Sequence, residues 1–254
     1  MNNNQATLQK LTAMRLQGMA RAFRATMETA VKQSFSPDEL ISHLVDVEWD
    51  DRHNRKLKRL IKAADFRYHV SFEEIDFGVK RNLDKNKLLR LSDCSWIERH
   101  QSILFTGPTG VGKSFIAQAL GHQGCVYGFK TGYHACSKLF QYLKLCRADG
   151  SYLKELARIA KQDLFILDDL GLEPFDGQSR LSLLEILEDR FARKSSIIVS
   201  QIPVDKWHEV IGDPTLADAI CDRIVHSAHR IELKGESVRK LQGRREDGQE
   251  VQSE

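Results

Sequence analysis

The sequence predicts an α/β protein with a parallel five-stranded sheet covered by helices on both faces, preceded by a small all-helical domain. From Ile103 onward, short apolar runs alternate with amphipathic segments, which is typical of a parallel sheet buried on both sides. A glycine-rich loop follows the first apolar run, as a strand-loop-helix phosphate site requires. Strands are expected at 102–106, 129–133, 163–168, 195–200 and 229–233, and helices at about 114–123, 137–147, 151–161, 178–193 and 215–226.

Length and composition set the limits of this reading. The chain has 254 residues, with 41% hydrophobic and 29% charged residues, which is ordinary for a soluble globular protein. No apolar run is long enough to span a bilayer and the first residues lack a signal-peptide pattern, so we expect a cytoplasmic protein with no membrane contact. The five cysteines form no C-x-x-C pair and are expected to be reduced thiols, mostly in the core.

The predicted domains are a helical module at 1–75, an α/β domain at 76–242 and a disordered polar tail at 243–254. Within the module, Ser36 is the expected N-cap of a long helix, with Pro37 at its first position and Glu39 completing a capping box. This helix is expected to run to about Ala64. The aromatic-rich connector from Phe66 to Phe77 could stack bases, but core packing is the preferred interpretation.

A run of cations lies within the long predicted helix. It has two possible uses: a solvated face with pairing to the acids just upstream, or a face that contacts nucleic-acid phosphates. From the charges alone the two are about equally favoured. The cations are Arg52, Arg55, Lys56, Lys58, Arg59 and Lys62.

Residues Gly107–Ser114 fit the pattern G-x-x-x-x-G-K-[ST] of a loop that binds the phosphates of ATP. Glycines there let backbone N–H groups surround phosphate oxygens, Lys113 reaches the β and γ phosphates, and the Ser114 hydroxyl binds Mg²⁺. The expected cofactors are therefore ATP and Mg²⁺. The expected nucleotide-binding residues of this segment are Gly107, Pro108, Thr109, Gly110, Val111, Gly112, Lys113, Ser114 and Phe115.

Two acids, Asp168 and Asp169, end an apolar run downstream of the loop. Asp168 is expected to lie near the metal ion, and Asp169 to orient or activate the attacking water as a catalytic residue with Lys113. A kinase for a small metabolite excludes water and does not need such an acid, so the pair favours an ATPase. A GTPase would normally carry N-K-x-D, which is absent.

Polar residues end a second apolar run. If that strand lies beside the acidic one, Ser200 or Gln201 would approach the γ phosphate and Gln201 would assist catalysis. Two later arginines, Arg223 and Arg239, could neutralise charge in the transition state, within the subunit or across a subunit boundary.

Together these residues resemble the IstB/DnaC branch of the AAA+ ATPases, and specifically the IstB-type transposition helper proteins. The resemblance covers nearly the whole chain. It includes Leu16–Ala20, Glu48-Trp49, Phe66–Phe77, the phosphate loop, Leu167–Gly171, Ser200-Gln201, Trp207, Gly212-Asp213, Asp222–Ile224 and Gly235–Arg239.

The resemblance implies an ATP-dependent homo-oligomer, ring or helical, that binds duplex DNA and assists a DDE transposase encoded by the same insertion sequence. It places Arg223 as an arginine finger on a neighbour's ATP, Ser200 and Gln201 at sensor 1, and Arg239 near sensor 2, and it favours DNA contact by the cations at 52–62. The alternative is a helicase loader of the DnaC type, which would use the helical module to bind the replicative helicase. A kinase for a small metabolite is the third hypothesis.

Overall fold

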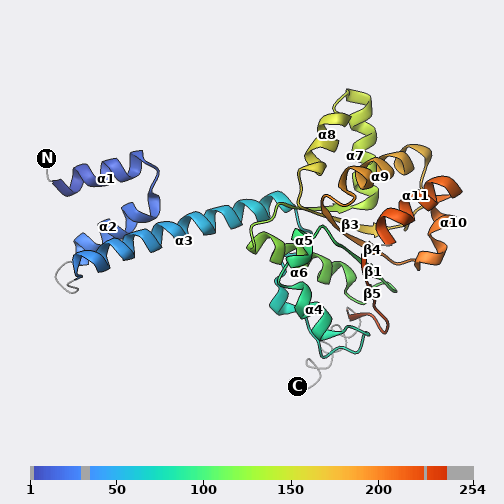
Figure 1. Ribbon diagram of the computed structural model, residues 1–254, viewed down its shortest axis with the longest axis horizontal. Helices are drawn as coiled ribbons and strands as arrows, with labels where there is room; N and C mark the ends of the chain where they lie inside the picture. Colours follow the sequence, from blue (N-terminus) through green and yellow to red (C-terminus); the bar gives the residue numbers. More distant parts are fainter. Residues whose placement is uncertain (1–2, 30–34, 226–227, 239–254) are drawn as a thin grey trace, which may run out of the picture. The chain divides into compact units, whose positions relative to one another are not determined.

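The computed structural model describes residues 3–29, 35–225 and 228–238, and these residues form two compact units. The units are Met1–Arg59 and Leu60–Glu254. The division falls inside a long helix, earlier than the boundary expected near residue 75. Figure 1 shows both units; the expected tail at 243–254 lies outside the described residues.

Three helices make up the described part of the first unit: α1 (Asn3–Ala13), α2 (Gln17–Thr29) and α3 (Pro37–Ala64), of which α3 continues into the second unit. The expected start of α3 is confirmed. The backbone N–H of Ser36 donates to Glu39 Oε2 at 2.8 Å, and the N–H of Glu39 donates to Ser36 Oγ at 3.3 Å. This reciprocal capping box stabilises the first turn, whose acids Asp38 and Glu39 also suit the positive helix end.

The second unit is built around a five-stranded parallel sheet with the order β2-β3-β4-β1-β5. The α/β fold predicted from the sequence is confirmed, and β1 and β4 have the expected bounds. The other three strands are displaced by one or two residues from those expected. The strands are β1 (Ser102–Thr106), β2 (Thr131–Ala135), β3 (Leu164–Leu170), β4 (Ser195–Ser200) and β5 (Ala228–Glu232).

Helices cover both faces of the sheet (Figure 1). Alternate strand residues explain this, because Ile103, Phe105 and Ile166 face one cluster while Leu104 and Phe165 face the other. On the first face lie η1 (Phe72–Glu74), α4 (Lys85–Leu91), α5 (Ser95–Glu98) and α6 (Lys113–Val126). On the second lie α7 (Cys136–Asp149), α8 (Tyr152–Ala160), α9 (Gly177–Arg190), η2 (Val204–Lys206), α10 (Trp207–Ile211) and α11 (Pro214–Val225).

The aromatic-rich connector packs in the core of the second unit. Val70, Phe72 and Ile75 are buried in the first-face cluster, and Phe66 packs against it. Core packing therefore accounts for these residues, as the sequence favoured. The short helix α10 was not expected, because a five-residue segment gives too little periodicity to detect.

The expected placement of the cysteines is largely confirmed, because Cys94, Cys125, Cys136 and Cys146 are buried free thiols and Cys221 is half-buried. Among the described residues, no helix is long and apolar enough to cross a membrane.

The strand order determines where polar residues meet. Strand β4 pairs with β1 on one side and with β3 on the other, and all three run parallel. Their carboxyl ends carry the phosphate loop after Thr106, the acids of β3 and the residue Gln201. These groups therefore converge at one edge of the sheet, where open α/β sheets bind their ligands.

Candidate functional site

The loop Gly107–Ser114 joins β1 to α6 in a backbone conformation that needs glycine. Gly107 has φ 136° and Gly112 has φ 94°, both in the left-handed region. A Cβ on Gly107 would lie 2.1 Å from the Leu233 carbonyl oxygen, and one on Gly112 would lie 2.5 Å from Arg81 Nη1. The loop is therefore a tight cradle immediately before a helix N-terminus, which is a suitable site for phosphate groups.

Lys113 is buried at the start of α6, and its ammonium group turns back onto the loop. Its Nζ donates to the carbonyl oxygens of Gly107 at 2.6 Å and Pro108 at 2.8 Å. Burial lowers the pKa of Lys113, and the charges of Asp168 and Asp169 oppose that shift. The loop thus contains a positive charge held only by neutral carbonyls, which an anion in the cradle could attract.

Asp168 is fully buried near the end of β3 and accepts three hydrogen bonds. Its Oδ1 accepts from Ser114 Oγ and from the Asp169 backbone N–H, and its Oδ2 accepts from the Tyr133 hydroxyl, each at 2.9 Å. Burial, and then the charge of Asp169, raise the pKa of Asp168. A buried carboxylate beside a serine hydroxyl is a suitable oxygen pair for Mg²⁺, so the residues present fit this ion.

A short polar chain links the loop to the second acid. Gln201 accepts a hydrogen bond from the Thr109 hydroxyl and donates through Nε2 to Asp169 Oδ1 at 3.3 Å. Asp169 has φ 62°, which a non-glycine residue rarely adopts, so its backbone conformation is strained. Because β4 lies between β1 and β3, the strand adjacency on which the prediction for Gln201 depended is present.

Ser200 differs from Gln201 in where its side chain points. It is fully buried, and its hydroxyl lies 2.9 Å from the Leu170 carbonyl oxygen and 3.1 Å from that of Ile202. These contacts join the ends of β3 and β4 and do not face the cradle. Gln201 is therefore the residue of this pair that lines the pocket.

The pocket around the cradle also contains Arg81, which lies in the irregular segment before α4 where the sequence shows neither a motif nor a periodicity. Tyr68, which lines the pocket as well, belongs to the aromatic-rich connector, for which core packing was the preferred interpretation. Tyr133, bonded to Asp168, lies in the middle of β2 where only the strand itself was expected. The pocket is lined by Arg67, Tyr68, Glu74, Asp76, Arg81, Thr109, Gly110, Gly112, Lys113, Ser114, Phe115, Asp169, Leu172, Gln201 and Val238.

Arg223 lies at the other edge of the sheet, near the end of α11. It lines a groove with Ser102 and Ser196, which belong to the amino-terminal ends of β1 and β4. Its Nη1 donates to the Ala219 carbonyl oxygen at 2.7 Å, and its Nη2 forms an ion pair with Glu188. Arg223 thus does not reach the nucleotide pocket of this chain. Arg239 lies outside the described residues.

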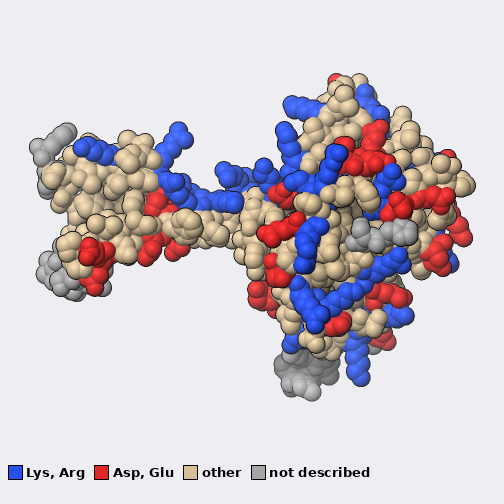
Figure 2. Space-filling view, in the orientation of Figure 1, with Lys and Arg blue, Asp and Glu red and all other residues tan. Residues whose placement is uncertain are grey.

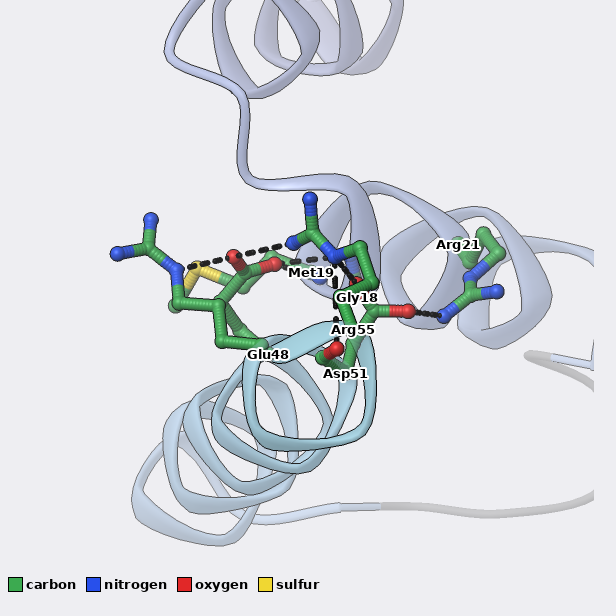
Figure 3. A network of polar contacts seen from close by, with 7 residues as sticks. Gly18, Met19, Arg21, Glu48, Asp51 and Arg55 are labelled. Atoms are coloured by element: carbon green, nitrogen blue, oxygen red, sulfur yellow. Dashed lines mark hydrogen bonds and ion pairs between the residues drawn. The ribbon is translucent and has the colours of Figure 1, made fainter. Parts of the chain in front are cut away.

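The cations of α3 divide into two groups. Figure 3 shows Glu48, which accepts from the backbone N–H groups of Gly18 at 2.8 Å and Met19 at 3.2 Å and so caps the start of α2. Arg52 Nε lies 2.7 Å from Glu48 Oε1, and Arg55 Nε lies 2.7 Å from an oxygen of Asp51. In addition, Arg21 donates to Asp51. Arg52 and Arg55 are therefore paired within α3, with the two acids that also hold α2.

The other cations of the first unit on α3 are Lys56, Lys58 and Arg59. All three are exposed, and in the described part of the chain none has an ion-pair partner. Lys62, on the same helix, is exposed as well and belongs to the second unit. Figure 2 shows Lys and Arg side chains gathered along this part of α3.

Solved structures similar to this one share its ATPase fold. DnaI matches with a TM-score of 0.53 at 20% identity, over 69% of this chain and 93% of that chain. The DnaC helicase loader matches with 0.51 at 20% identity, over 70% and 99%. DnaA from Aquifex aeolicus bound to AMPPCP matches with 0.56 at 17% identity, over 75% and 58%. With the phosphate cradle and the paired acids, this fold defines a P-loop ATPase of the AAA+ class.

The chain belongs to the family of IstB-like ATP binding proteins, whose model matches residues 9–246. Insertion sequence ATP-binding protein y4pL of Sinorhizobium fredii is 44% identical over 239 residues, 94% of this chain and 98% of its own. The ATP-binding protein of insertion sequence IS1162 from Pseudomonas fluorescens is 38% identical, over 78% and 87%. That of IS21 from Pseudomonas aeruginosa is 26% identical, over 90% and 86%. The protein is thus an ATP-binding ATPase of insertion-sequence type.

Proposed function

We propose that this protein is an ATP-dependent regulator that assembles on duplex DNA and assists the DDE transposase of its insertion sequence. The observation that carries the proposal is the pairing of an AAA+ ATPase site with an exposed cationic segment of α3 in an insertion-sequence family. ATP binding favours the DNA-bound assembly, and hydrolysis drives release or turnover.

In the proposed site, Lys113 leaves the Gly107 and Pro108 carbonyl groups and donates to the phosphate oxygens of ATP. Ser114 and Asp168 would hold Mg²⁺, which would supply positive charge to neutralise the phosphates of ATP. Asp169 orients and deprotonates the attacking water, while Gln201, already bonded to Asp169 and Thr109, reports whether the γ phosphate is present.

The proposed assembly places ATP at the boundary between two copies of this chain. The position of Arg223 supports it, because this arginine lies at the sheet edge opposite its own phosphate cradle. A neighbouring subunit would bring Arg223 to the γ phosphate, where it stabilises the charge of the transition state. The ion pair with Glu188 would hold the guanidinium in place until the subunits meet.

The proposed DNA contact uses the free cations of α3. Lys56, Lys58 and Arg59 are exposed and unpaired among the described residues, whereas Arg52 and Arg55 are engaged with Glu48 and Asp51. Free cations neutralise phosphates without first breaking an ion pair, so they contribute most to salt-dependent DNA binding. Contacts to phosphates alone carry no sequence information, so we expect this binding to show little sequence preference.

The test is duplex DNA binding by fluorescence anisotropy, with and without a non-hydrolysable ATP analogue, over a range of salt concentrations. For the wild-type protein we expect tighter binding with the analogue. In the double variant Lys56→Gln/Arg59→Gln we expect the slope of log affinity against log salt to fall by about 2, because about one counterion is released per phosphate contact.

The matched control is Lys154→Gln/Lys161→Gln, which removes two exposed cations from and just after α8. We expect its salt slope to equal that of the wild-type protein. The proposal would be refuted if neither the ATP analogue nor the α3 substitutions changed the affinity for duplex DNA or its salt dependence. The helicase-loader alternative predicts that outcome together with tight binding of a replicative helicase, and the insertion-sequence relatives argue against it.

A further inference from the structure

Arg81, in the segment before α4, is a buried arginine that lies beside the phosphate loop of the ATPase unit. Only 4% of Arg81 is exposed. Its Nη1 donates to the Val111 carbonyl oxygen at 3.2 Å and its Nη2 to the Asp76 carbonyl oxygen at 2.7 Å. Its Nε is buried and has no hydrogen-bond partner among the described residues. A buried cation with an unused donor is costly unless something else satisfies it.

Arg190 shows what a buried arginine with a purely structural role looks like in this protein. It is 2% exposed and donates to the Ser196 hydroxyl and to the carbonyl oxygens of Ile159, Gln162 and Ser195. Its Nε is thus satisfied by Ser196, and it lies at the amino-terminal edge of the sheet. Arg81 has the same burial but fewer partners, and it lies at the opposite edge, against the phosphate loop.

The guanidinium of Arg81 lines the nucleotide pocket at Gly112, where α6 begins. A Cβ on Gly112 would lie 2.5 Å from Arg81 Nη1, so the glycine leaves just enough room for this contact. No carboxylate lies within ion-pair distance of Arg81 in the described part of the chain. Burial lowers the pKa of Arg81, and the charge of Asp76 opposes that shift.

The surrounding backbone holds Arg81 in place from two sides. The N–H of Lys234 donates to the Arg81 carbonyl oxygen at 3.0 Å, and the N–H of Val238 donates to the Gly110 carbonyl oxygen at 2.9 Å. The segment after β5 is therefore hydrogen-bonded both to the phosphate loop and to the irregular segment that carries Arg81. A side chain positioned this firmly beside the cradle is prepared to act without rearrangement.

We propose that Arg81 is a second cationic ligand of the nucleotide, donating to the phosphates that ATP and ADP share. Its place at Gly112 is away from the γ end of the pocket, which Thr109, Gln201 and Asp169 mark. Arg81 therefore stabilises both nucleotides equally and contributes to retention of ADP after hydrolysis. This inference rests on the nucleotide site and is independent of DNA binding and of the transposase.

The test compares Arg81→Gln, Arg81→Lys and Arg190→Gln by calorimetric titration with ATP, ADP and GTP, and by thermal unfolding of the nucleotide-free full chain. For Arg81→Gln we expect ATP and ADP affinity to fall by the same factor, about 10- to 100-fold, which is the effect of one hydrogen bond to a charged group. We expect Arg81→Lys to recover part of the loss, and the ratio of ATP to GTP affinity to stay unchanged.

Two results would overturn the inference. A changed ATP to GTP ratio would show that Arg81 reads the base, and an unchanged ADP affinity would show that it only supports the loop. Arg190→Gln is the control: we expect a lower melting temperature with unchanged ADP affinity of the folded protein. If Arg81→Gln does not fold, the test depends on Arg81→Lys. An ADP affinity of Arg81→Lys equal to that of the wild-type protein would then contradict the proposal. Loss of ADP binding in Lys113→Ala tests the pocket assignment separately.

Discussion

The Ser114 hydroxyl donates to Asp168 Oδ1 at 2.9 Å, which joins the phosphate loop to the end of β3 across the carboxyl edge of the sheet. The two oxygens come from segments 54 residues apart and meet in a partly buried position, with Asp168 fully buried. This contact places a hydroxyl and a carboxylate where one metal ion could bind both.

Asp168→Asn removes the negative charge while keeping the shape of the side chain. We expect ATP hydrolysis to fall by about 10²- to 10³-fold, because a preorganised electrostatic contact to the transferring phosphate is lost. The measurement is phosphate release over a range of Mg²⁺ concentrations, in which the variant should need far more Mg²⁺ for half-maximal activity. A Mg²⁺ dependence equal to that of the wild-type protein would exclude Asp168 as the metal ligand.

Lys113→Ala removes the cation that rests on the Gly107 and Pro108 carbonyl groups. We expect ATP affinity to fall by more than about 100-fold, since two or more charged hydrogen bonds to phosphate are lost. Isothermal titration with ATP measures this directly. Lys161→Ala, an exposed lysine after α8, is the control and should bind ATP normally. Undiminished affinity in Lys113→Ala would contradict the loop assignment.

Arg223→Ala should leave ATP binding intact and reduce hydrolysis by about 10³-fold, the lower range for loss of an arginine finger. Because Arg223 lies away from its own pocket, we expect activity to return in part when this variant is mixed with Asp169→Asn subunits. Mixed interfaces combine an intact Arg223 from one subunit with an intact Asp169 from the other. Phosphate release from each variant alone is the baseline, and no gain on mixing would exclude action between subunits.

Gly18→Ala should loosen α2 from α3. A Cβ at this position would lie 2.7 Å from Glu48 Cα and 2.7 Å from the Val47 carbonyl oxygen, so the helices must move apart. We expect a loss of about 1–3 kcal/mol, typical of overpacking, and a weaker cap on α2. Hydrogen exchange of α1 and α2 in the full chain measures it, and protection equal to wild type would contradict the close packing.

The control for this substitution is Gly177→Ala at the start of α9. A Cβ there meets nothing within 4 Å. We therefore expect no loss of protection anywhere in the chain, and ATP hydrolysis should be normal in both glycine variants.

The stability of the ATPase unit should decrease in mild acid because of His134 in β2. Burial lowers the pKa of His134 to about 4, and its Nε2 lies 3.3 Å from Gln162 Oε1. The unfolded chain binds a proton below about pH 6.5 while the folded protein does not, so the free energy of unfolding falls as the pH drops from about 6.5 towards 4. The loss at pH 5 is on the order of 1–2 kcal/mol.

Urea unfolding of wild type and His134→Gln between pH 7 and pH 4.5 measures this effect. Glutamine does not titrate and can still bond to Gln162, so we expect a flatter pH dependence in the variant. Equal pH dependence in the two proteins would exclude His134 as its source.

Much of the fold and the core of the candidate site could be predicted from the sequence because the signals are local. The capping box at Ser36 and Glu39 sits within one helical turn, and the glycines of the phosphate loop are required by backbone conformations that few other residues adopt. The alternation of apolar runs and amphipathic helices is also visible in short stretches of sequence, and it correctly predicted the parallel sheet. Strand ends were displaced by up to two residues, because the edges of an apolar run do not determine where pairing begins.

Other features depended on contacts between segments far apart in the chain, and the tertiary structure alone decided them. The pairing of β4 with β1 and β3 brings Gln201 to Thr109 and Asp169, while Ser200 turns into the interior. The irregular segment before α4 brings Arg81 to the phosphate loop without any motif that would identify it.

The helical module shows the same division. The sequence by itself determined that α3 carries a run of cations and left two uses open. In the structure, Glu48 and Asp51 hold α2 through Gly18, Met19 and Arg21 and engage Arg52 and Arg55 in the same network, while DNA contact by the other cations stays a prediction. The ion pairs of Arg52 and Arg55 join residues four apart on α3, so the sequence by itself places them. That the same acids also bond to Gly18, Met19 and Arg21 depends on contacts about 30 residues apart, which only the packing of α2 on α3 decides.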